Sequence, residues 1–282
     1  MEIPMLIHVF LLAAVLVGPI EAAQSDFEAG RYDDAIKALL AMHQMAPEDA
    51  AVNHWLSRSY YEEKHYDLAI AYGEQAVKGA SQNAEYHRWL GRAYGAKAEQ
   101  SRSFFLARKV KKAFETAVNV APLNIAARRD LMQYLVEAPW IVGGDKEKAK
   151  QHVEFITKLD PVQGRLARAA FLSTEKKWRE AEVEYLAALD QHPDTIQSYI
   201  EAADFFADRK DVVNLELVLA GASHSGFRDP RLEFYRAVVL VLRRTELSTA
   251  EASLRTYLTS VPERSDYPSH RAALTWLAAA QK

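Results

Sequence analysis

A period of 34 residues in the amino-terminal part of the sequence constrains the fold more than any other feature. Three positions recur at this spacing, as Trp55 and Trp89, Leu56 and Leu90, and Tyr60 and Tyr94. A second set recurs ahead of them, as Gly30 and Lys64, Tyr32 and Tyr66, Ala35 and Ala69, and Ile36 and Ile70. A period of this length indicates small units that must stack to bury their apolar faces. We therefore expect an elongated array of helix pairs.

The composition favours helices along the whole array. Long stretches are rich in Ala, Leu, Glu, Lys and Arg, which are strong helix formers, whereas Gly and Pro number only 11 and 10. No alternating apolar and polar run bounded by turn residues predicts a strand. Five prolines stand where a second helix should end before the next pair begins: Pro47, Pro122, Pro161, Pro193 and Pro262. Small side chains are expected where paired helices approach closely, at Ala35, Ala69, Ala181 and Ala250.

These features resemble the tetratricopeptide repeat family. Its motif has Leu, a small residue and Tyr on a first helix, then an aromatic residue, an Ala on the second helix, and Pro. The second half of this motif recurs late in the chain, at Trp178, Ala181, Tyr185, Ala188, Leu189 and Pro193, and at Ala250, Leu254, Tyr257, Leu258 and Pro262. The resemblance implies an all-α fold, a right-handed α-solenoid of antiparallel helix pairs. A non-repetitive helical bundle is the alternative.

The resemblance also divides the chain over residues 24–282. It gives a partial repeat at 24–49, then repeats at 50–83, 84–122, 123–161, 162–195, 196–230 and 231–264. A last helix within 265–282 is expected to cap the array with Ala272, Ala273 and Leu277, because a solenoid must cover its final exposed face. The repeat at 196–230 is degenerate, since Leu215 replaces the expected Ala and Phe227 the expected Pro.

The amino end differs in character from the rest. Residues 3–20 contain no Lys, Arg, Asp or Glu, and their apolar run ends at Gly18 and Pro19, which the small residues Ala22 and Ala23 follow. This layout predicts a signal peptide at 1–23 and an exported protein, periplasmic or secreted. Glu2 and the absence of Lys or Arg before the apolar run argue against it. An uncleaved anchor holding a membrane-bound assembly factor, and a buried amino-terminal helix, therefore remain as alternatives.

Two connections inside helix pairs are longer than the motif requires. The insertion near 95–109 is longer by about seven residues and the one near 136–148 by about five. The first carries Phe104 and Phe105 among basic residues, and the second carries an apolar run, Trp140, Ile141 and Val142. We expect these apolar side chains to pack on one another, because burying an aromatic side chain stabilises by about 1.5–3 kcal/mol. The alternative is a protruding apolar and basic knob that binds a partner or a membrane surface.

In the tetratricopeptide family the first helices line a concave face. The resemblance places a series of side chains there, namely Ala51, His54, Arg58, Tyr61, Glu62, Glu85, Arg88, Arg92, Ala126, Arg129 and Gln133. Further along it places a less basic series, namely Gln163, Leu166, Ala170, Gln197, Ile200, Asp204, Asp208, Leu232, Tyr235 and Val239.

Arginine side chains on successive first helices point to the chemistry of a partner. Guanidinium groups present planar forks suited to carboxylates. We predict a protein or peptide partner, with an acidic peptide or a C-terminal carboxylate bound by His54, Arg58, Tyr61, Arg88, Arg92, Arg129 and Gln133, and with Phe104 and Phe105 as a second contact. The alternative is that the arginines pair with Glu62, Glu85 or Asp130.

Other function classes find little support in the sequence. Lys and Arg total 35 against 38 Asp and Glu, so the protein has no net positive electrostatic field that would favour binding of nucleic acid. The absence of cysteine excludes disulfides, thiolate metal sites and a cysteine nucleophile. Gly143, Gly144 and Asp145 lack the rest of a phosphate-loop motif, and we expect Asp145 to cap a helix instead.

The one candidate catalytic constellation is also weak. Ser223, His224, Ser225 and Asp229 would lie on a single loop, whereas a catalytic triad gathers residues from separate elements. We therefore expect a non-enzymatic scaffold without catalytic residues, cofactor or metal, with an enzyme as a remote alternative. Contact with a membrane is expected only if the amino-terminal segment is uncleaved, and the oligomeric state is unspecified.

A narrower resemblance concerns the setting of the protein. The stretches at 91–100, 130–134 and 141–144 resemble a set of exported bacterial tetratricopeptide proteins. This resemblance implies a bacterial cell envelope and carries no established activity, so no functional residue follows from it.

Overall fold

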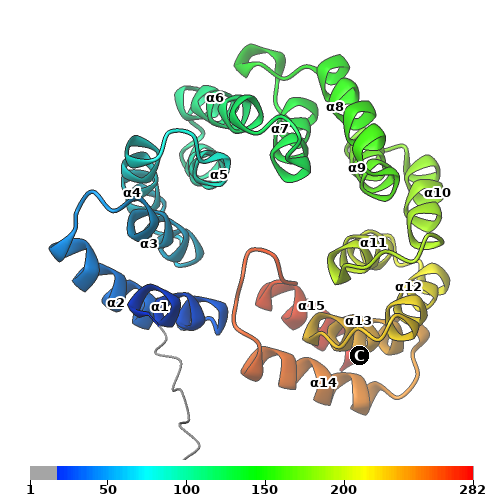
Figure 1. The fold of residues 1–282 in the computed structure, drawn as a ribbon. Helices are drawn as coiled ribbons and strands as arrows, with labels where there is room; N and C mark the ends of the chain where they lie inside the picture. Colours follow the sequence, from blue (N-terminus) through cyan, green and yellow to red (C-terminus); the bar gives the residue numbers. More distant parts are fainter. Residues whose placement is uncertain (1–17, 282) are drawn as a thin grey trace, which may run out of the picture.

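The computed structural model describes residues 18–281, and within them it is helical throughout (Figure 1). Most of the predicted signal peptide, residues 1–17, lies outside the described residues. One helix of each successive pair lies on the inner side of the array: α1 (Pro19–Glu28), α3 (Ala50–Glu62), α5 (Ala84–Ser101), α7 (Ile125–Glu137), α9 (Pro161–Thr174), α11 (Ile196–Asp208), α13 (Pro230–Arg243) and α15 (His270–Ala280). The predicted all-α solenoid is confirmed.

The second helices of the pairs form the outer layer of the array. They are α2 (Tyr32–Met45), α4 (Tyr66–Gly79), α6 (Phe104–Val120), α8 (Lys146–Leu159), α10 (Trp178–Leu189), α12 (Val212–His224) and α14 (Leu247–Ser260). A short 3-10 helix, η1 (Trp140–Val142), lies between α7 and α8. No helix within residues 18–281 combines the length and the apolar character that a bilayer crossing requires.

Polar side chains and prolines set the ends of these helices. The first helices α3, α5, α7 and α9 begin behind caps whose side-chain oxygens accept backbone N–H groups: Asp49, Asn83, Asn124 and Asp160. Asp145 caps α8 in the same way, as predicted, with Oδ1 3.1 Å from the backbone nitrogen of Lys148. Such caps satisfy amide groups that the helix itself leaves unpaired. Pro161 differs from the expectation, since it opens α9 rather than only ending α8.

The apolar core runs along the array as three consecutive clusters. The first joins α1, α2 and α3, the second extends from α5 to α10, and the third extends from α9 to α15. The four predicted close-approach alanines, Ala35, Ala69, Ala181 and Ala250, are fully buried. Helix α15 covers the last pair, with Ala273 and Leu277 buried and Ala272 partly buried against the core. Each unit therefore derives its stability from its neighbours.

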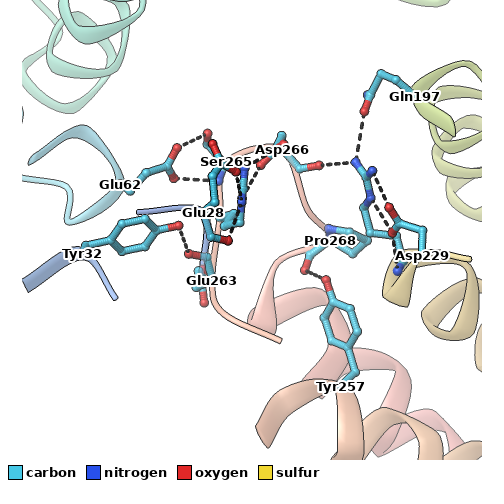
Figure 2. A network of polar contacts seen from close by, with 12 residues as sticks. Glu28, Tyr32, Glu62, Gln197, Asp229, Tyr257, Glu263, Ser265, Asp266 and Pro268 are labelled. Carbon is cyan, nitrogen blue, oxygen red and sulfur yellow. Dashed lines mark hydrogen bonds and ion pairs between the residues drawn. The ribbon is translucent and has the colours of Figure 1, made fainter. Parts of the chain in front are cut away.

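The array curves until its two ends meet, so that the chain forms a ring (Figure 1). The closing segment is the loop of residues 261–269 between α14 and α15, which we call the clasp. The backbone carbonyl of Glu263 accepts a hydrogen bond from the Tyr32 hydroxyl at 3.2 Å, and Nη1 of Arg264 lies 3.0 Å from Oε2 of Glu28 (Figure 2). Residues more than 200 positions apart are thereby held in direct contact.

The clasp also binds the end of α3 and the beginning of α13. The backbone nitrogen and hydroxyl of Ser265 both lie 2.8 Å from the carboxylate of Glu62 (Figure 2). On the opposite side, Nη1 of Arg231 donates to the backbone carbonyl of Asp266 at 3.3 Å. Burial by itself would lower the pKa of Arg264, but the nearby carboxylates outweigh it and raise this pKa, so the clasp arginine stays charged.

Gly30 permits the close approach between the clasp and the first turn of the array. Its φ angle is +73°, a left-handed conformation that side chains disfavour. A Cβ atom placed on Gly30 would lie 2.1 Å from Cβ of Pro262. Glycine is therefore required here for two reasons, one in the backbone and one across the ring closure.

We predict that Gly30→Ala separates the two ends of the ring. The added methyl group cannot coexist with Pro262, so the clasp must move away from α1 and α2. The chain has no cysteine, so spin labels can be attached at Asp33→Cys and Arg271→Cys, two exposed positions on either side of the closure. Pulsed electron resonance should give a longer and broader distance distribution for the variant than for the parent.

Gly226→Ala is the matched control for this experiment. Gly226 has a similar φ of +78°, but no atom lies within 4 Å of the position that its Cβ would take. Both substitutions should cost about 1–2 kcal/mol of stability through the backbone conformation alone. Only Gly30→Ala should change the distance; an unchanged distance in that variant would contradict the closure described here.

Candidate functional site

A hollow of about 660 Å³ lies on the inner wall of the ring. Four successive inner helices, α5, α7, α9 and α11, and the clasp contribute to its lining: Arg88, Arg92, Ile125, Ala126, Arg129, Asp130, Met132, Gln133, Gln163, Gln197, Glu201 and Asp266. The structure thus brings together four of the predicted binding residues, Arg88, Arg92, Arg129 and Gln133. It also places the predicted lining residues Gln163 and Gln197 beside them.

The arginines of the hollow are already paired with carboxylates. Oδ2 of Asp130 lies 2.8 Å from Nε of Arg88, and Oδ1 lies 3.0 Å from Nη2 of Arg92, so one aspartate bridges two helices and two cations. Arg88 also contacts Glu85 at 2.6 Å. The pairs with Asp130 and Glu85 that the sequence left as an alternative are therefore present, whereas Glu62 binds the clasp.

A second ion pair crosses the hollow from α7 to α11. Nη2 of Arg129 lies 2.6 Å from Oε2 of Glu201, and both side chains are about one-fifth exposed. Burial by itself would lower the pKa of Arg129, but the adjacent Glu201 carboxylate outweighs it and raises this pKa. For Arg92 burial likewise acts to lower the pKa, and the adjacent Asp130 carboxylate outweighs it, so the pKa of Arg92 is raised. Both guanidinium groups therefore remain charged, and together with their partners they give the wall both signs of charge.

Two glutamine side chains give the hollow unused hydrogen-bond donors. The side-chain carbonyl of Gln163 accepts from Arg129 at 3.3 Å, and that of Gln197 accepts from Arg231 at 3.0 Å. Their amide nitrogens form no hydrogen bond within residues 18–281. Amide nitrogens of this kind suit the carbonyl oxygens of a peptide backbone.

Two of the predicted binding residues lie in the wall rather than in the hollow. His54 is only 5% exposed and stacks on the ring of Tyr86 at 4.4 Å between centroids. Burial, together with the charge of Arg58, lowers the pKa of His54 to about 3, so its ring is neutral at ordinary pH. Tyr61 packs edge-on against Trp89 at 5.7 Å. Both side chains hold neighbouring helices together.

Arg58 lies inside an aromatic cage. Its guanidinium carbon is 4.3 Å from the ring centre of Trp55, and Phe27 and Trp89 lie at 4.6 and 4.4 Å. Burial lowers the pKa of Arg58, although the neighbouring carboxylates oppose that effect. The three rings stabilise the cation through their faces, so Arg58 joins α1, α3 and α5. Arg58 does not line the hollow.

The predicted assignment of residues to the inner face of the array is wrong for several positions in the later repeats. Four residues expected on the inner face, Leu166, Ile200, Leu232 and Tyr235, are buried in the core. Glu201, which the sequence did not predict, lines the hollow beside the predicted Gln197, whereas Ile200 is buried. A signal for this was present, since the polar residues of α11 recur with helical spacing at Gln197, Glu201, Asp204 and Asp208.

Asp204 has an unusual environment next to this site. The hydroxyl of Tyr235 donates a hydrogen bond to its carboxylate. Burial raises the pKa of Asp204 to about 6, and the neighbouring charges of Asp208 and Glu201 act in the same direction, whereas the Tyr235 hydrogen bond opposes them. Asp204 therefore changes charge within the physiological range.

The expected contact between the two insertions is wrong for most of their apolar side chains. Phe104 and Phe105 are 63% and 69% exposed, and Trp140 and Ile141 are 84% and 50% exposed. Only Val142 is buried. The Tyr134 hydroxyl lies 2.7 Å from the backbone carbonyl oxygen of Ala107 and 2.8 Å from that of Val142. The Tyr134 side chain therefore joins the backbones of the two segments, while their large apolar side chains point outward.

The residues that suggested a catalytic triad have other partners. The Ser223 hydroxyl donates to the carbonyl of Leu219, Ser225 pairs with the hydroxyl of Tyr199, and Asp229 caps α13. His224 forms no hydrogen bond with either serine in the described part of the chain. Among residues 18–281, no group of three or more His, Cys, Asp or Glu side chains could hold a metal ion.

Comparisons with known proteins agree with this architecture. Residues 26–94 match the tetratricopeptide repeat family. The structure is similar to a tetratricopeptide repeat protein from Parabacteroides merdae, with 14% identity, a TM-score of 0.58, and coverage of 94% of this chain and 98% of that one. The described chain therefore has the fold of tetratricopeptide repeat proteins, and the family itself is matched over residues 26–94.

Two further structures share the fold with this chain. One is a thermophilic tetratricopeptide repeat protein from Thermus thermophilus, with 20% identity, a TM-score of 0.54, and coverage of 67% of this chain and 97% of that one. The other is a human IFIT1 dimer with m7Gppp-AAAA, with 17% identity, a TM-score of 0.55, and coverage of 84% of this chain and 54% of that one. At these identities the likeness concerns the fold alone. No curated protein matches the chain.

We predict that Asp204→Asn changes the pH dependence of stability. In the wild type the pKa of Asp204 in the folded state, about 6, exceeds the ordinary value. Asp204 therefore contributes to the free energy of unfolding in full at low pH, below its ordinary pKa. That contribution is lost as the pH rises through 6. The melting temperature of the variant minus that of the wild type should therefore be higher above pH 7 than at pH 4.

Tyr235→Phe provides the second arm of this test. Removing the hydroxyl removes a hydrogen bond that lowers the pKa of Asp204, so the carboxyl should titrate at a higher pH than in wild type. Carbon-detected NMR of the Asp204 carboxyl gives a direct measurement. A melting-temperature difference that does not vary with pH, or that varies in the opposite sense, would show that burial does not raise the pKa of Asp204.

Proposed function

We propose that this protein is a non-enzymatic scaffold that binds an extended peptide segment of another protein on the inner wall of its ring. The observation that carries the proposal is the hollow, in which four successive inner helices present polar side chains to one space. Packed helices lie 8–10 Å apart, so four of them span roughly 25–30 Å. An extended peptide of about eight residues covers that length.

The chemistry of the wall favours a peptide that carries at least one carboxylate. Arg92 is the most exposed of the three paired arginines, at 36% of its side chain, so it can contact a ligand while keeping Asp130. The free amide nitrogens of Gln163 and Gln197 can donate to peptide carbonyls, and Glu201 can accept from peptide N–H groups. A peptide with an acidic side chain or a C-terminal carboxylate near Arg92 would therefore use all of these polar groups of the wall.

A nucleic acid suits this wall less well than a peptide. The IFIT1 structure with the same fold contains m7Gppp-AAAA. In this protein the arginines of the hollow alternate with three carboxylates, those of Asp130, Glu201 and Asp266. A chain of phosphates would meet these like charges at close range, whereas a peptide offers donors as well as acceptors.

We also propose that the protein is exported and that the scaffold acts in a bacterial cell envelope. The uncharged segment 3–20 and the following Ala22 and Ala23 support this placement. In the described structure α1 begins at Pro19 and buries Ala23 and Phe27 in the first core cluster, so cleavage after Ala23 would remove the first half of α1 and leave Phe27. The alternative remains an anchor formed by an uncleaved amino-terminal segment.

Amino-terminal sequencing of the protein recovered from fractionated bacterial cells tests this placement. We predict a mature chain that starts within a few residues of Ala23 and is found outside the cytoplasm. An intact amino terminus in the membrane fraction would support the anchor, and an intact one in the cytoplasm would exclude export.

Site-specific photo-crosslinking tests the peptide site. A photoreactive amino acid replaces Gln133, which lines the hollow, and in a second variant it replaces Val213, which is exposed on the outer helix α12. Each full-length variant is incubated with a library of random peptides of about eight residues, and the attached peptides are sequenced. We expect acidic peptides to be enriched at position 133 and no defined set at position 213.

Two arginine variants then test the proposed chemistry. Arg92→Gln should weaken binding of an enriched peptide roughly tenfold, because it removes a charged hydrogen bond to the ligand. Arg243→Gln is the matched control, since it removes an arginine that is equally bound to a carboxylate, Glu216 at 2.6 Å, but lies away from the hollow. Equal loss in both variants, or no enrichment at position 133, would refute the inner-wall site.

A further inference from the structure

The hairpin formed by α5 and α6 protrudes from one face of the ring. These helices have 18 and 17 residues, whereas α3, α4 and α7 have 13 or 14. The difference of about one helical turn corresponds to roughly 5–6 Å of additional length. Because the turn at 102–103 carries Phe104 and Phe105 directly behind it, these two rings lie at the outermost point of the hairpin.

A second apolar tip lies beside the first. Helix η1 presents Trp140 and Ile141 to solvent, and its position is fixed by the contacts of Tyr134 with Ala107 and Val142. Gly144 allows this arrangement, because a Cβ atom there would lie 1.8 Å from the carbonyl oxygen of Ala138. We call the four exposed side chains Phe104, Phe105, Trp140 and Ile141 the apolar rim.

Cations stand behind the apolar rim on the same face of α6. Arg108 and Lys112 follow Phe104 by one and two turns, so at 1.5 Å per residue they lie about 6 and 12 Å further from the tip. Arg102 flanks the tip in the turn itself. These three cations form no ion pair within residues 18–281, in contrast to Lys109, which contacts Glu74 at 3.1 Å.

We propose that the apolar rim docks on an anionic lipid surface. Aromatic and aliphatic side chains enter the boundary between headgroups and acyl chains, and cations a few ångströms behind them meet the lipid phosphates. Long Arg and Lys side chains can reach headgroups while their stems remain over apolar surface. The layered order of rings first and cations behind fits such a boundary, and it is independent of the peptide site on the inner wall.

The shape of the rim favours a lipid surface over a protein partner. A hollow of about 450 Å³ lies between the two segments, but of the four rim side chains only Phe104 lines it. Phe105, Trp140 and Ile141 lie outside it and are exposed to solvent. This second hollow is lined by two carboxylates, Glu99 and Glu137, as well as by Arg102. We therefore assign the contact with lipid phosphates to the exposed cations Arg108 and Lys112 on α6 rather than to this hollow.

Fluorescent labels on the full-length chain test the proposal. An environment-sensitive probe is attached at Ile141→Cys in the rim, or at Leu123→Cys, which is also exposed and lies in the turn at the other end of α6. No other cysteine competes for the label. The apolar segment 3–20 could carry the chain to vesicles by itself, so the comparison of the two positions, and not binding as such, is the readout.

With vesicles of phosphatidylcholine and phosphatidylglycerol, we expect severalfold brighter and blue-shifted emission from the probe at position 141. Quenchers placed in the acyl chains should reach it. The probe at position 123 should not change, and vesicles of phosphatidylcholine alone should give a weak response. Equal responses at 141 and 123, or none at 141, would overturn the proposal; a response at 141 only to an added protein would assign the rim to a protein partner instead.

Two variants separate the apolar and charged parts of the rim. Phe104→Ser with Phe105→Ser should abolish the change at position 141, and Arg108→Glu with Lys112→Glu should weaken the apparent vesicle affinity of that response about tenfold or more. All four side chains point to solvent or the surface, so circular dichroism should show unchanged melting. A full response in the Phe104→Ser, Phe105→Ser variant would also overturn the proposal.

Discussion

The contact between the clasp and the first three helices sets the shape of the whole molecule. In a solenoid each unit touches only its neighbours, so the overall curvature is the sum of many small local rotations. The clasp adds a constraint of a different kind, because Arg264 and Ser265 bind Glu28 and Glu62 across the ring. It also holds Asp266 at the edge of the hollow, so the shape of the candidate site depends on the closure.

The same pair of helices, α5 and α7, supports two surfaces that face different directions. Their inner sides carry Arg88, Arg92 and Arg129, whose charges are balanced by Asp130 and Glu201. Their ends on one face of the ring hold the segments that form the apolar rim. One rigid core cluster lies beneath both, so a ligand inside the ring and a surface against its rim can be engaged together without a rearrangement of the fold.

Sequence reasoning succeeded wherever the structure follows local rules. The 34-residue period predicted the helix pairs, the small residues predicted their close approach, and Asp145 was expected as a cap. The inner arginines were grouped because the motif register holds in the strong repeats. Ile200 was misplaced and Glu201 was missed because the motif is degenerate in the repeat at 196–230 and does not fix the inner-face positions of α11. The packing of the rim was mispredicted because the gain from burying apolar area does not take into account hydrogen bonds that hold the two segments, such as those from the Tyr134 hydroxyl to backbone carbonyls. The ring closure was not predicted because it joins residues, such as Tyr32 and Glu263, that are not related by the 34-residue period.

The joining of the two ends changes how such an array comes apart. A linear stack frays from its termini, since the first and last units each have a single neighbour to hold them. Here α1 and α15 belong to units that the clasp joins, so opening either end requires loss of the bonds at Glu28 and Glu62 as well. Amide hydrogen exchange in α1 and α15 should then be nearly as slow as in the middle of the array, and unfolding should be more concerted than the repeat architecture by itself implies.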